Sequence, residues 1–192
     1  MGAFDEAPLV EVETAAEWRA WLEAHHASAH GVWLVIGRTG SGGTGPAYEV
    51  AVEEALCFGW VDSKGGAIDE QRSKLYFAPR RPRSAWAGTN KARVERLMAA
   101  GRMAPAGLAA IEAAKENGSW TILDSVERLE VPDDLAAALS ARPGAREHWD
   151  AFPRSVRRSA LESVAFARRS ETRASRIEQI AVLAERNERP VR

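Results

Sequence analysis

The sequence predicts an α+β protein in which a small mixed N-terminal half, with a short antiparallel sheet or hairpin, precedes an all-helical C-terminal half. Both strand signals, a short apolar run and an alternating segment, lie before residue 80. Residues 79–83 hold two prolines and three arginines, which oppose both a helix and a central strand. Beyond them, apolar residues recur at helical spacing. We therefore expect a mixed half over residues 1–83 and a helical half over residues 84–192.

The first elements follow from capping and apolar runs. Thr14 is placed to cap a helix, Glu17 completes a capping box, and the helix should end near His25. Residues 32–36 form an unbroken apolar run between glycines, which favours a buried strand. The glycine-rich residues 38–46 lack the Lys-Ser/Thr pair of a phosphate-binding P-loop, so they predict a flexible linker.

A helix and a hairpin complete the first half. Pro46 suits the first turn of a helix that Gly59 ends. Residues 60–78 predict a β-hairpin, with turns or a bulge at residues 64–66 and 69–71. Alternation places Ser73, Leu75 and Phe77 on one face and Arg72, Lys74 and Tyr76 on the other.

The second half should consist of successive helices. Two apolar stripes precede residue 120, at Val94, Leu97 and Met98 and at Leu108 and Ile111. Pro132 and Pro143 stand where two short helices would begin. Pro153 should open a long helix, on which four arginines fall within about 60° of one line: Arg154, Arg157, Arg158 and Arg168. A final helix carries Ile177, Ile180, Ala181 and Ala184 on one face.

Composition excludes several classes of protein. The chain has 192 residues, is 45% hydrophobic and holds seven tryptophans, which favours a folded globule over disorder. The single cysteine, Cys57, lies in an apolar run, which favours a buried structural thiol over a nucleophile. No apolar run reaches the ~20 residues of a membrane span, and no signal peptide is apparent, so we expect a cytoplasmic protein.

Cofactor and metal motifs are absent from the sequence. The four histidines do not recur at metal-ligand spacing and are not joined by cysteines. No serine elbow or Ser, His and Asp arrangement is present. We therefore expect no metal and no cofactor, and the sequence gives no catalytic motif.

Charge is segregated along a chain whose net charge is only −1. Residues 1–60 carry 9 acidic and 2 basic side chains, whereas residues 61–100 carry 4 acidic and 9 basic ones. Exposed ion pairs stabilise a fold little, so a local basic excess favours a binding surface for phosphate, carboxylate or an acidic protein face. The groove between the two halves is the expected site.

Ten residues between 60 and 90 form the candidate site: Trp60, Asp62, Arg72, Lys74, Arg80, Arg81, Arg83, Ser84, Trp86 and Asn90. Guanidinium groups form paired bonds to phosphate or carboxylate, and a serine hydroxyl can complete an anion cradle. The same arginines can instead be structural and bond carbonyls and acids inside the protein.

Four of these residues have open alternatives. Asp62 either pairs with Arg72 across the hairpin or acts as a general base in an enzyme. Asn90 either caps a helix or binds the ligand. Trp60 and Trp86 flank the basic hairpin, where partial exposure of their rings would allow stacking on a ligand or an arginine.

Several motifs together resemble the bacterial YdeI/OmpD-associated family, whose members are often labelled bacteriocin-protection proteins. The resemblance rests on EALCFGWVDS, PRRPRSAW, Asn90, RLMAAGRMAPAGLAAIEAAKENGSW and the C-terminal FPRSVRRSALESVAFARRSETRASRIEQIAVL, in which SETRASRI is most distinctive. Ala78 and Ala87 depart from the family pattern. The resemblance implies a helical family-defining domain at about residues 130–188 and possible association with an envelope protein, but it names no reaction.

Three functions are compatible with these features. The first is a non-enzymatic protein of bacterial stress or bacteriocin tolerance that binds an anionic small molecule or an acidic partner through the basic groove. The second is an enzyme acting on a phosphate- or carboxylate-bearing substrate, with Asp62 moving a proton. The third is a nucleic-acid adaptor, which the pI of about 6.5 and the acids between the C-terminal arginines disfavour.

Overall fold

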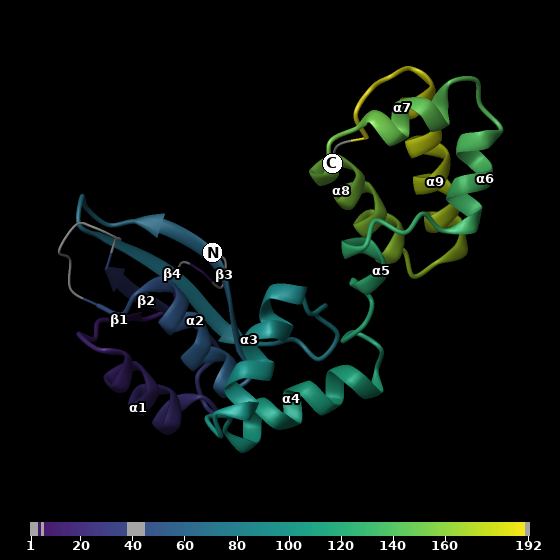
Figure 1. The fold of residues 1–192 in the computed structure, drawn as a ribbon. Coiled ribbons are helices and arrows are strands. Elements are labelled where there is room, and N and C mark those ends of the chain that lie inside the picture. Colours follow the sequence, from purple (N-terminus) through teal and green to yellow (C-terminus); the bar gives the residue numbers. More distant parts are fainter. Residues whose placement is uncertain (1–3, 5, 38–44, 191–192) are drawn as a thin grey trace. The chain divides into compact units, whose positions relative to one another are not determined.

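A computed structural model of the chain describes residue 4, residues 6–37 and residues 45–190. Most of the predicted glycine-rich linker lies outside the described residues. The chain divides into two compact units, Met1–Trp120 and Thr121–Arg192 (Figure 1). The proline-rich segment instead predicts a division after Arg83. In the structure the next two helices, α3 (Gly88–Ala99) and α4 (Pro105–Glu116), pack on the first unit.

The first unit contains a four-stranded sheet, so the predicted α+β class is confirmed. Its strands are β1 (Leu9–Val10), β2 (Val32–Gly37), β3 (Trp60–Ala67) and β4 (Arg72–Pro79), in the order β1-β2-β4-β3. The predicted hairpin β3–β4 is antiparallel, and β4 also pairs antiparallel with β2. The short strand β1, which the sequence analysis missed, runs parallel to β2.

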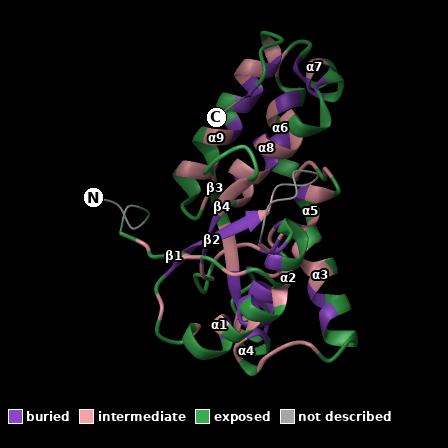
Figure 2. Ribbon diagram, turned by 90° about the vertical axis from the view of Figure 1, so that its left-hand side faces the viewer, coloured by how far each residue is buried: buried purple, intermediate pink, exposed green. Residues whose placement is uncertain are grey.

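Side chains of β2 and β4 alternate between the two faces of the sheet. The inner face carries Leu34 and Phe77, which belong to the buried core together with residues of α1 (Ala15–His25) and α2 (Tyr48–Cys57). Buried residues are purple in Figure 2. Trp18 of α1 contacts Phe77 with ring centroids 5.4 Å apart. The outer face carries Trp33, Lys74 and Tyr76. The predicted alternation in β4 therefore holds.

The expected N-cap and core thiol are both present. Thr14 caps α1, and its Oγ1 accepts the Glu17 N–H at 3.2 Å. The Glu17 carboxylate accepts the Glu13 N–H at 2.9 Å rather than that of the cap residue, so the capping box is displaced by one residue. Cys57 is fully buried at the end of α2, and burial raises the pKa of its thiol.

Helices α2 and α4 approach closely at Gly107. A Cβ built on Gly107 would lie 2.2 Å from the Cys57 carbonyl oxygen, so only a residue without a side chain fits there. Gly59, which ends α2, has φ +74 and lies against the Ala106 backbone. Two predicted stripe residues are exposed: Met98 is 47% and Leu108 is 40% exposed. The other predicted stripe residues, Val94, Leu97 and Ile111, are buried in the core, as expected.

The second unit is helical, as expected. Its helices are α5 (Asp124–Glu127), α6 (Asp133–Ser140), α7 (Ala145–Ala151), α8 (Arg154–Ala165) and α9 (Ser170–Glu185). Helix α9 packs against α6, α7 and α8. Buried Leu135, Trp149 and Ile180 belong to its interior.

The predicted long arginine face is wrong at its far end. Helix α8 ends at Ala165, and the extended residue Arg169 precedes α9, so Arg168 lies between the two helices. Neither Gly nor Pro marks this break in the sequence, which is why helical periodicity was extended through it. Arg158 pairs with Glu162 at 2.9 Å, and Arg154 donates to the Glu127 carbonyl at 2.5 Å. Internal contacts thus account for part of this face.

Candidate functional site

All ten candidate residues lie in the first unit, but they do not form one cluster. Arg72 begins β4 and Arg80 follows its end, so about 25 Å of extended chain separates them. Arg72 pairs with Asp69 at 2.9 Å and with Glu11 at 3.6 Å. Lys74 lies on the outer face of the sheet, with its Nζ 4.5 Å from the centre of the Trp33 ring. The predicted patch is therefore divided.

Both candidate tryptophans are buried. Trp60 is 1% exposed and donates from Nε1 to the His26 carbonyl at 3.3 Å, and Trp86 is 2% exposed. The expected partial exposure of these rings is wrong, because each is covered by neighbours. Trp86 nevertheless stacks as anticipated, since the Arg80 guanidinium carbon lies 3.9 Å from its ring centre.

Arg80 is the unusual member of the set. Its backbone N–H donates to the Gly59 carbonyl at 2.9 Å, and its Nη2 donates to the Ala85 carbonyl at 2.7 Å. Its Nε is buried without a hydrogen-bond partner in the described residues. Within that same part of the chain, no carboxylate oxygen lies within 4.0 Å of its guanidinium. Arg80 is thus a half-buried cation whose charge is not neutralised by direct contact.

Burial lowers the pKa of Arg80 to about 10, and attraction from Asp62 opposes that shift. The guanidinium stays charged at neutral pH. A cation whose pKa falls on burial is less stable in the folded protein than in water. A bound anion would reverse this effect.

Asp62 lies on β3 opposite Phe77, on the same face as the core. Its Oδ2 accepts the Tyr48 hydroxyl proton at 3.2 Å. Burial, and then the Asp62 charge, raise the pKa of Tyr48, which keeps the phenol protonated. The expected alternative in which Asp62 pairs with Arg72 is wrong: the register places Asp62 five residues away from Arg72 along β4, and Arg72 pairs with Asp69 and Glu11.

Arg81, Arg83 and Ser84 form the exposed turn beside Arg80. Neither Arg81 nor Arg83 has a carboxylate within 4.0 Å in the described ranges, and both side chains are exposed. The Ser84 hydroxyl donates to the Arg81 carbonyl at 3.0 Å, so it closes the turn. Asn117 fixes the same turn by donating to the Pro82 carbonyl at 2.6 Å. Two exposed guanidinium groups, without a carboxylate partner among the described residues, therefore lie beside the half-buried one.

Asn90 does not cap a helix. Helix α3 begins at Gly88 after the N-cap Ala87, so Asn90 is the third helical residue. Its Oδ1 accepts from Arg93 Nη1 at 2.7 Å. Arg93 also donates to both Glu49 oxygens, at 2.8 and 2.6 Å, and holds the pKa of that carboxyl below its usual range. Asn90 thus orients an arginine that the sequence analysis did not select.

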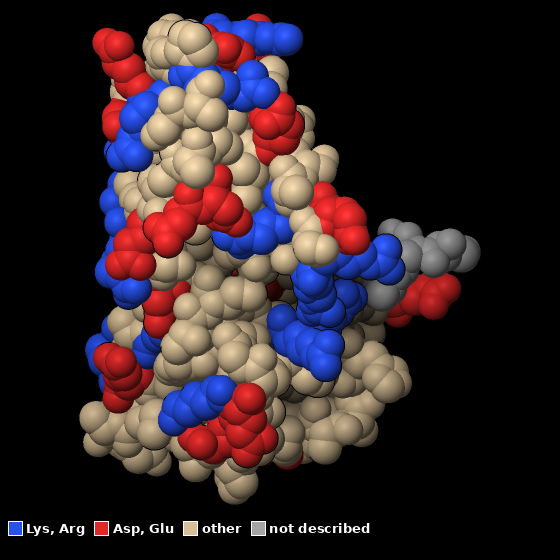
Figure 3. All heavy atoms as spheres, turned by 90° about the vertical axis from the view of Figure 1, so that its right-hand side faces the viewer, with Lys and Arg blue, Asp and Glu red and all other residues tan. Residues whose placement is uncertain are grey.

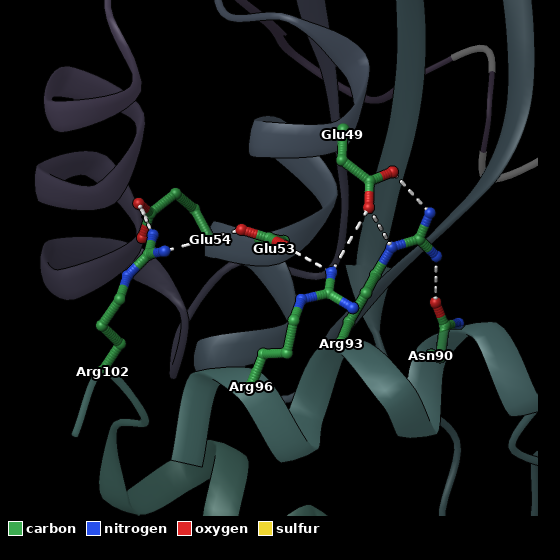
Figure 4. A network of polar contacts seen from close by, with 7 residues as sticks. All are labelled: Glu49, Glu53, Glu54, Asn90, Arg93, Arg96 and Arg102. Carbon is green, nitrogen blue, oxygen red and sulfur yellow. Dashed lines mark hydrogen bonds and ion pairs between the residues drawn. The ribbon is translucent and has the colours of Figure 1, made fainter. Parts of the chain in front are cut away.

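An α2–α3 charge ladder explains much of the charge segregation along the chain. Figure 4 shows carboxylates of α2 facing guanidinium groups of α3 and the following segment: Glu49, Glu53 and Glu54 against Arg93, Arg96 and Arg102. The acidic excess before residue 60 and the basic excess after it therefore partly neutralise each other. Acidic and basic side chains are also interspersed on the face in Figure 3.

The sequence did not single out three residues that take part in these contacts: Tyr48, Glu49 and Arg93. Only the spacing of the charged residues hints at such contacts. Glu49 and Glu53 are four residues apart on one predicted helix, and Arg93 and Arg96 are three apart on another. This spacing puts like charges on one helix face, but it does not say which helices meet. The described residues contain no group of three or more His, Cys, Asp or Glu side chains placed to hold a metal. Their helices include none that could cross a membrane.

The distinctive SETRASRI segment of α9 has a structural role. Arg173 donates from Nε and Nη2 to the two Asp134 oxygens at 2.7 and 3.0 Å, and from Nη1 to the Val164 carbonyl at 3.4 Å. Arg176 donates to the Ser163 carbonyl. These two arginines therefore tie α9 to α8 and to the start of α6.

We expect Asp134→Asn to weaken the second unit by about 1 kcal/mol at pH 7, because its pair with Arg173 is half exposed. Arg173 holds the pKa of Asp134 below its usual value, so this stability is present above pH ~4 and is lost as the pH falls through the folded-state pKa. Amide hydrogen exchange of α9 should differ between the two proteins at pH 7 and converge near pH ~2. Asp133→Asn, which changes the neighbouring exposed acid, is the control; an equal effect of both variants would contradict this role.

Comparison with protein families covers both units. A model described as a domain of unknown function, DUF8412, matches residues 10–110, which is more than half of the chain. The chain belongs to this family. The DUF8412 region includes all ten candidate residues, together with Tyr48 and Arg93.

A second family model covers the C-terminal unit of this DUF8412 protein. It is described as bacteriocin-protection, YdeI or OmpD-associated, and matches residues 128–187. The family resemblance is thus confirmed, and the match lies close to the expected range of about 130–188. Neither the curated proteins nor the solved structures contain a match.

Proposed function

We propose that the first unit binds a small phosphate- or carboxylate-bearing molecule at Arg80, with Arg81 and Arg83 contributing charge from the adjacent turn. The observation that carries this proposal is the half-buried Arg80 guanidinium, which stacks on Trp86 and has no carboxylate within 4.0 Å in the described part of the chain. An anion would supply the missing countercharge through paired N–H bonds.

Specific features support this position over the rest of the basic segment. Stacking on Trp86 and the bond to Ala85 fix the guanidinium plane, so little side-chain entropy is lost on binding. Arg81 and Arg83 are exposed and lack carboxylate partners among the described residues. By contrast, Arg72 is already paired with Asp69 and Glu11, so we leave it out of the proposed site.

A thermal-shift screen tests this proposal with phosphate, citrate, nucleotides, sugar acids and cell-wall fragments, each against sodium chloride at equal ionic strength. Six of the seven tryptophans lie in the first unit, so intrinsic fluorescence follows its unfolding. A ligand at ~100 times its Kd should raise the melting temperature by about 5 °C or more. The Arg80→Met and Arg81→Ala variants should lose this shift, and Arg72→Ala should keep it.

Arg80→Met keeps an unbranched apolar stem over Trp86 while removing the charge, so we expect it to fold. If this variant melts at a lower temperature and no anion stabilises either protein, Arg80 is a structural contact and the proposal fails. Equal stabilisation of the wild type and Arg80→Met by an anion would also reject this site.

We further propose that this binding serves bacteriocin or stress tolerance and takes place in the cytoplasm. An acidic protein surface is the alternative partner of the arginines. The description of the C-terminal family model supports the physiological setting. A deletion strain should become sensitive, and Arg80→Met should restore tolerance less than Arg72→Ala. Fractionation tests the location.

The enzyme alternative rests on Asp62 and its neighbour Tyr48. The pair offers a carboxylate and a protonated phenol close to the charge of Arg80, a combination suited to proton transfer. Turnover of a ligand found in the screen, abolished by Asp62→Asn with binding retained, would favour it. The nucleic-acid alternative would require both units, and a steep salt dependence of affinity is its test.

A further inference from the structure

The outer face of the sheet holds a second basic site that is separate from Arg80. A cavity of about 450 Å³ is lined there by Lys64 and Lys74, the Gly65–Gly66 backbone and the apolar side chains of Leu9 and Trp33 and their neighbours. This volume lies within the range of small-ligand pockets. The cavity draws on all four strands or the segments beside them.

A β-bulge places Lys64 in this cavity. Asp62 pairs with Phe77 and Gly65 pairs with Leu75. Between these two pairs, β3 has two residues, Ser63 and Lys64, where β4 has only Tyr76. Strict alternation from Asp62 would put Lys64 on the inner face. The extra residue changes the phase, and the Lys64 Nζ lies 5.3 Å from the centre of the Phe4 ring on the outer face.

The two ammonium groups have no carboxylate partner among the described residues. Lys74 Nζ lies 4.5 Å from the Trp33 ring centre and Lys64 Nζ lies over Phe4, and within the described ranges neither nitrogen has a carboxylate oxygen within 4.0 Å. Each ammonium occupies an aromatic face that a ligand cation would otherwise use, so the cavity repels cations. The remaining N–H donors are suited to an anion.

The rest of the lining is apolar or lacks a side chain. Leu9 is 51% exposed and Phe4 is 39% exposed, although both are large apolar residues. Gly66, which pairs with Lys74, leaves the floor between the lysines open: a Cβ there would point to the outer face, 3.6 Å from Lys74 Cε. Two cations beside exposed apolar surface match a molecule with one charged end and one apolar end.

We propose that this cavity binds a small amphipathic carboxylate. The carboxylate accepts hydrogen bonds from Lys64 and Lys74, and the hydrocarbon part covers Leu9 and Phe4. This site lies on the opposite face of the sheet from Asp62 and needs no residue of the Arg80 site.

Titration of the full chain with decanoate below its micellar concentration tests the proposal. Trp33 Nε1 donates to the Phe4 carbonyl at 2.8 Å, so its indole N–H resonance reports from the cavity itself. We expect saturable shifts of this resonance with decanoate and binding at least about tenfold weaker with the neutral decanol. Lys64→Gln and Lys74→Gln should each weaken decanoate binding about tenfold.

Gly66→Val and Lys115→Gln complete the set. Gly66→Val fills the floor while keeping both ammonium groups, and it should abolish binding. Lys115→Gln removes one exposed positive charge of α4, which belongs to neither proposed site, and should leave the affinity unchanged. The proposal fails if the Trp33 resonance does not shift, if decanol binds as tightly as decanoate, or if Lys64→Gln binds as the wild type does. Lys64 is exposed, so its variant should fold even if Lys74→Gln does not.

Discussion

Glu54→Gln should lower the free energy of unfolding of the first unit by about 3 kcal/mol. The Glu54 side chain is 7% exposed and accepts bonds from Arg19 Nη1 at 2.9 Å and Arg102 Nη2 at 2.5 Å. A neutral amide retains the volume but removes the buried countercharge that both guanidinium groups share, and leaves Arg19 with the exposed Glu23 and Arg102 with Glu53 at 3.5 Å. Urea unfolding followed by tryptophan fluorescence measures the change.

Glu23→Gln is the matched control for Glu54→Gln. Glu23 also pairs with Arg19, at 3.2 Å, but its side chain is 57% exposed, so its loss should change stability by less than about 1 kcal/mol. Equal effects of the two variants would show that burial of Glu54 does not matter. A small effect of both would mean that Arg19 and Arg102 are adequately hydrated without Glu54.

Gly107→Ala should destabilise the same unit by about 3 kcal/mol, because α4 cannot keep its distance from the end of α2. The new methyl group would lie 2.2 Å from the Cys57 carbonyl oxygen and 2.8 Å from the Met103 Cε. The methionine can move aside, but the carbonyl belongs to the backbone. Calorimetry of the full chain should show a lower melting temperature for the first unit.

Gly66→Ala is the control for Gly107→Ala, since both variants add one methyl group. On β3 the new Cβ would meet Lys74 carbons at 3.6 and 3.7 Å, an ordinary contact, so stability should change little. Destabilisation by Gly66→Ala as large as that by Gly107→Ala would refute the explanation by close helix packing.

Local patterns were sufficient to predict most of the elements. Three signals depend only on residues within the element itself: the Thr14 cap, the apolar run of β2 and the alternation of β4. All three elements are present in the structure. Strand β1 has two residues and is defined by its pairing with β2, so no local pattern marks it. The break before α9 likewise has no Gly or Pro.

The candidate site was less predictable because charge partners come from distant elements. The sequence left open whether Trp86 stacks on a ligand or on an arginine, and the structure places Arg80, six residues away, on its ring. The sequence could not indicate that Arg93 forms an ion pair with Glu49, 44 residues away. Nor could it indicate that Arg72 pairs with Asp69 and Glu11. Whether a basic excess is free or neutralised internally depends on which helix faces meet, and composition does not contain that information.

The bulge in β3 also bears on self-association. Strand β3 is at the edge of the sheet, where unpaired backbone groups can template the addition of another chain. The bulge makes the backbone of β3 irregular, so an incoming strand could not form a continuous hydrogen-bond ladder with it. Lys64 on the outer face also adds a positive charge, and two such edges would repel each other. We therefore expect this edge to resist intermolecular sheet growth and fibril formation at high protein concentration.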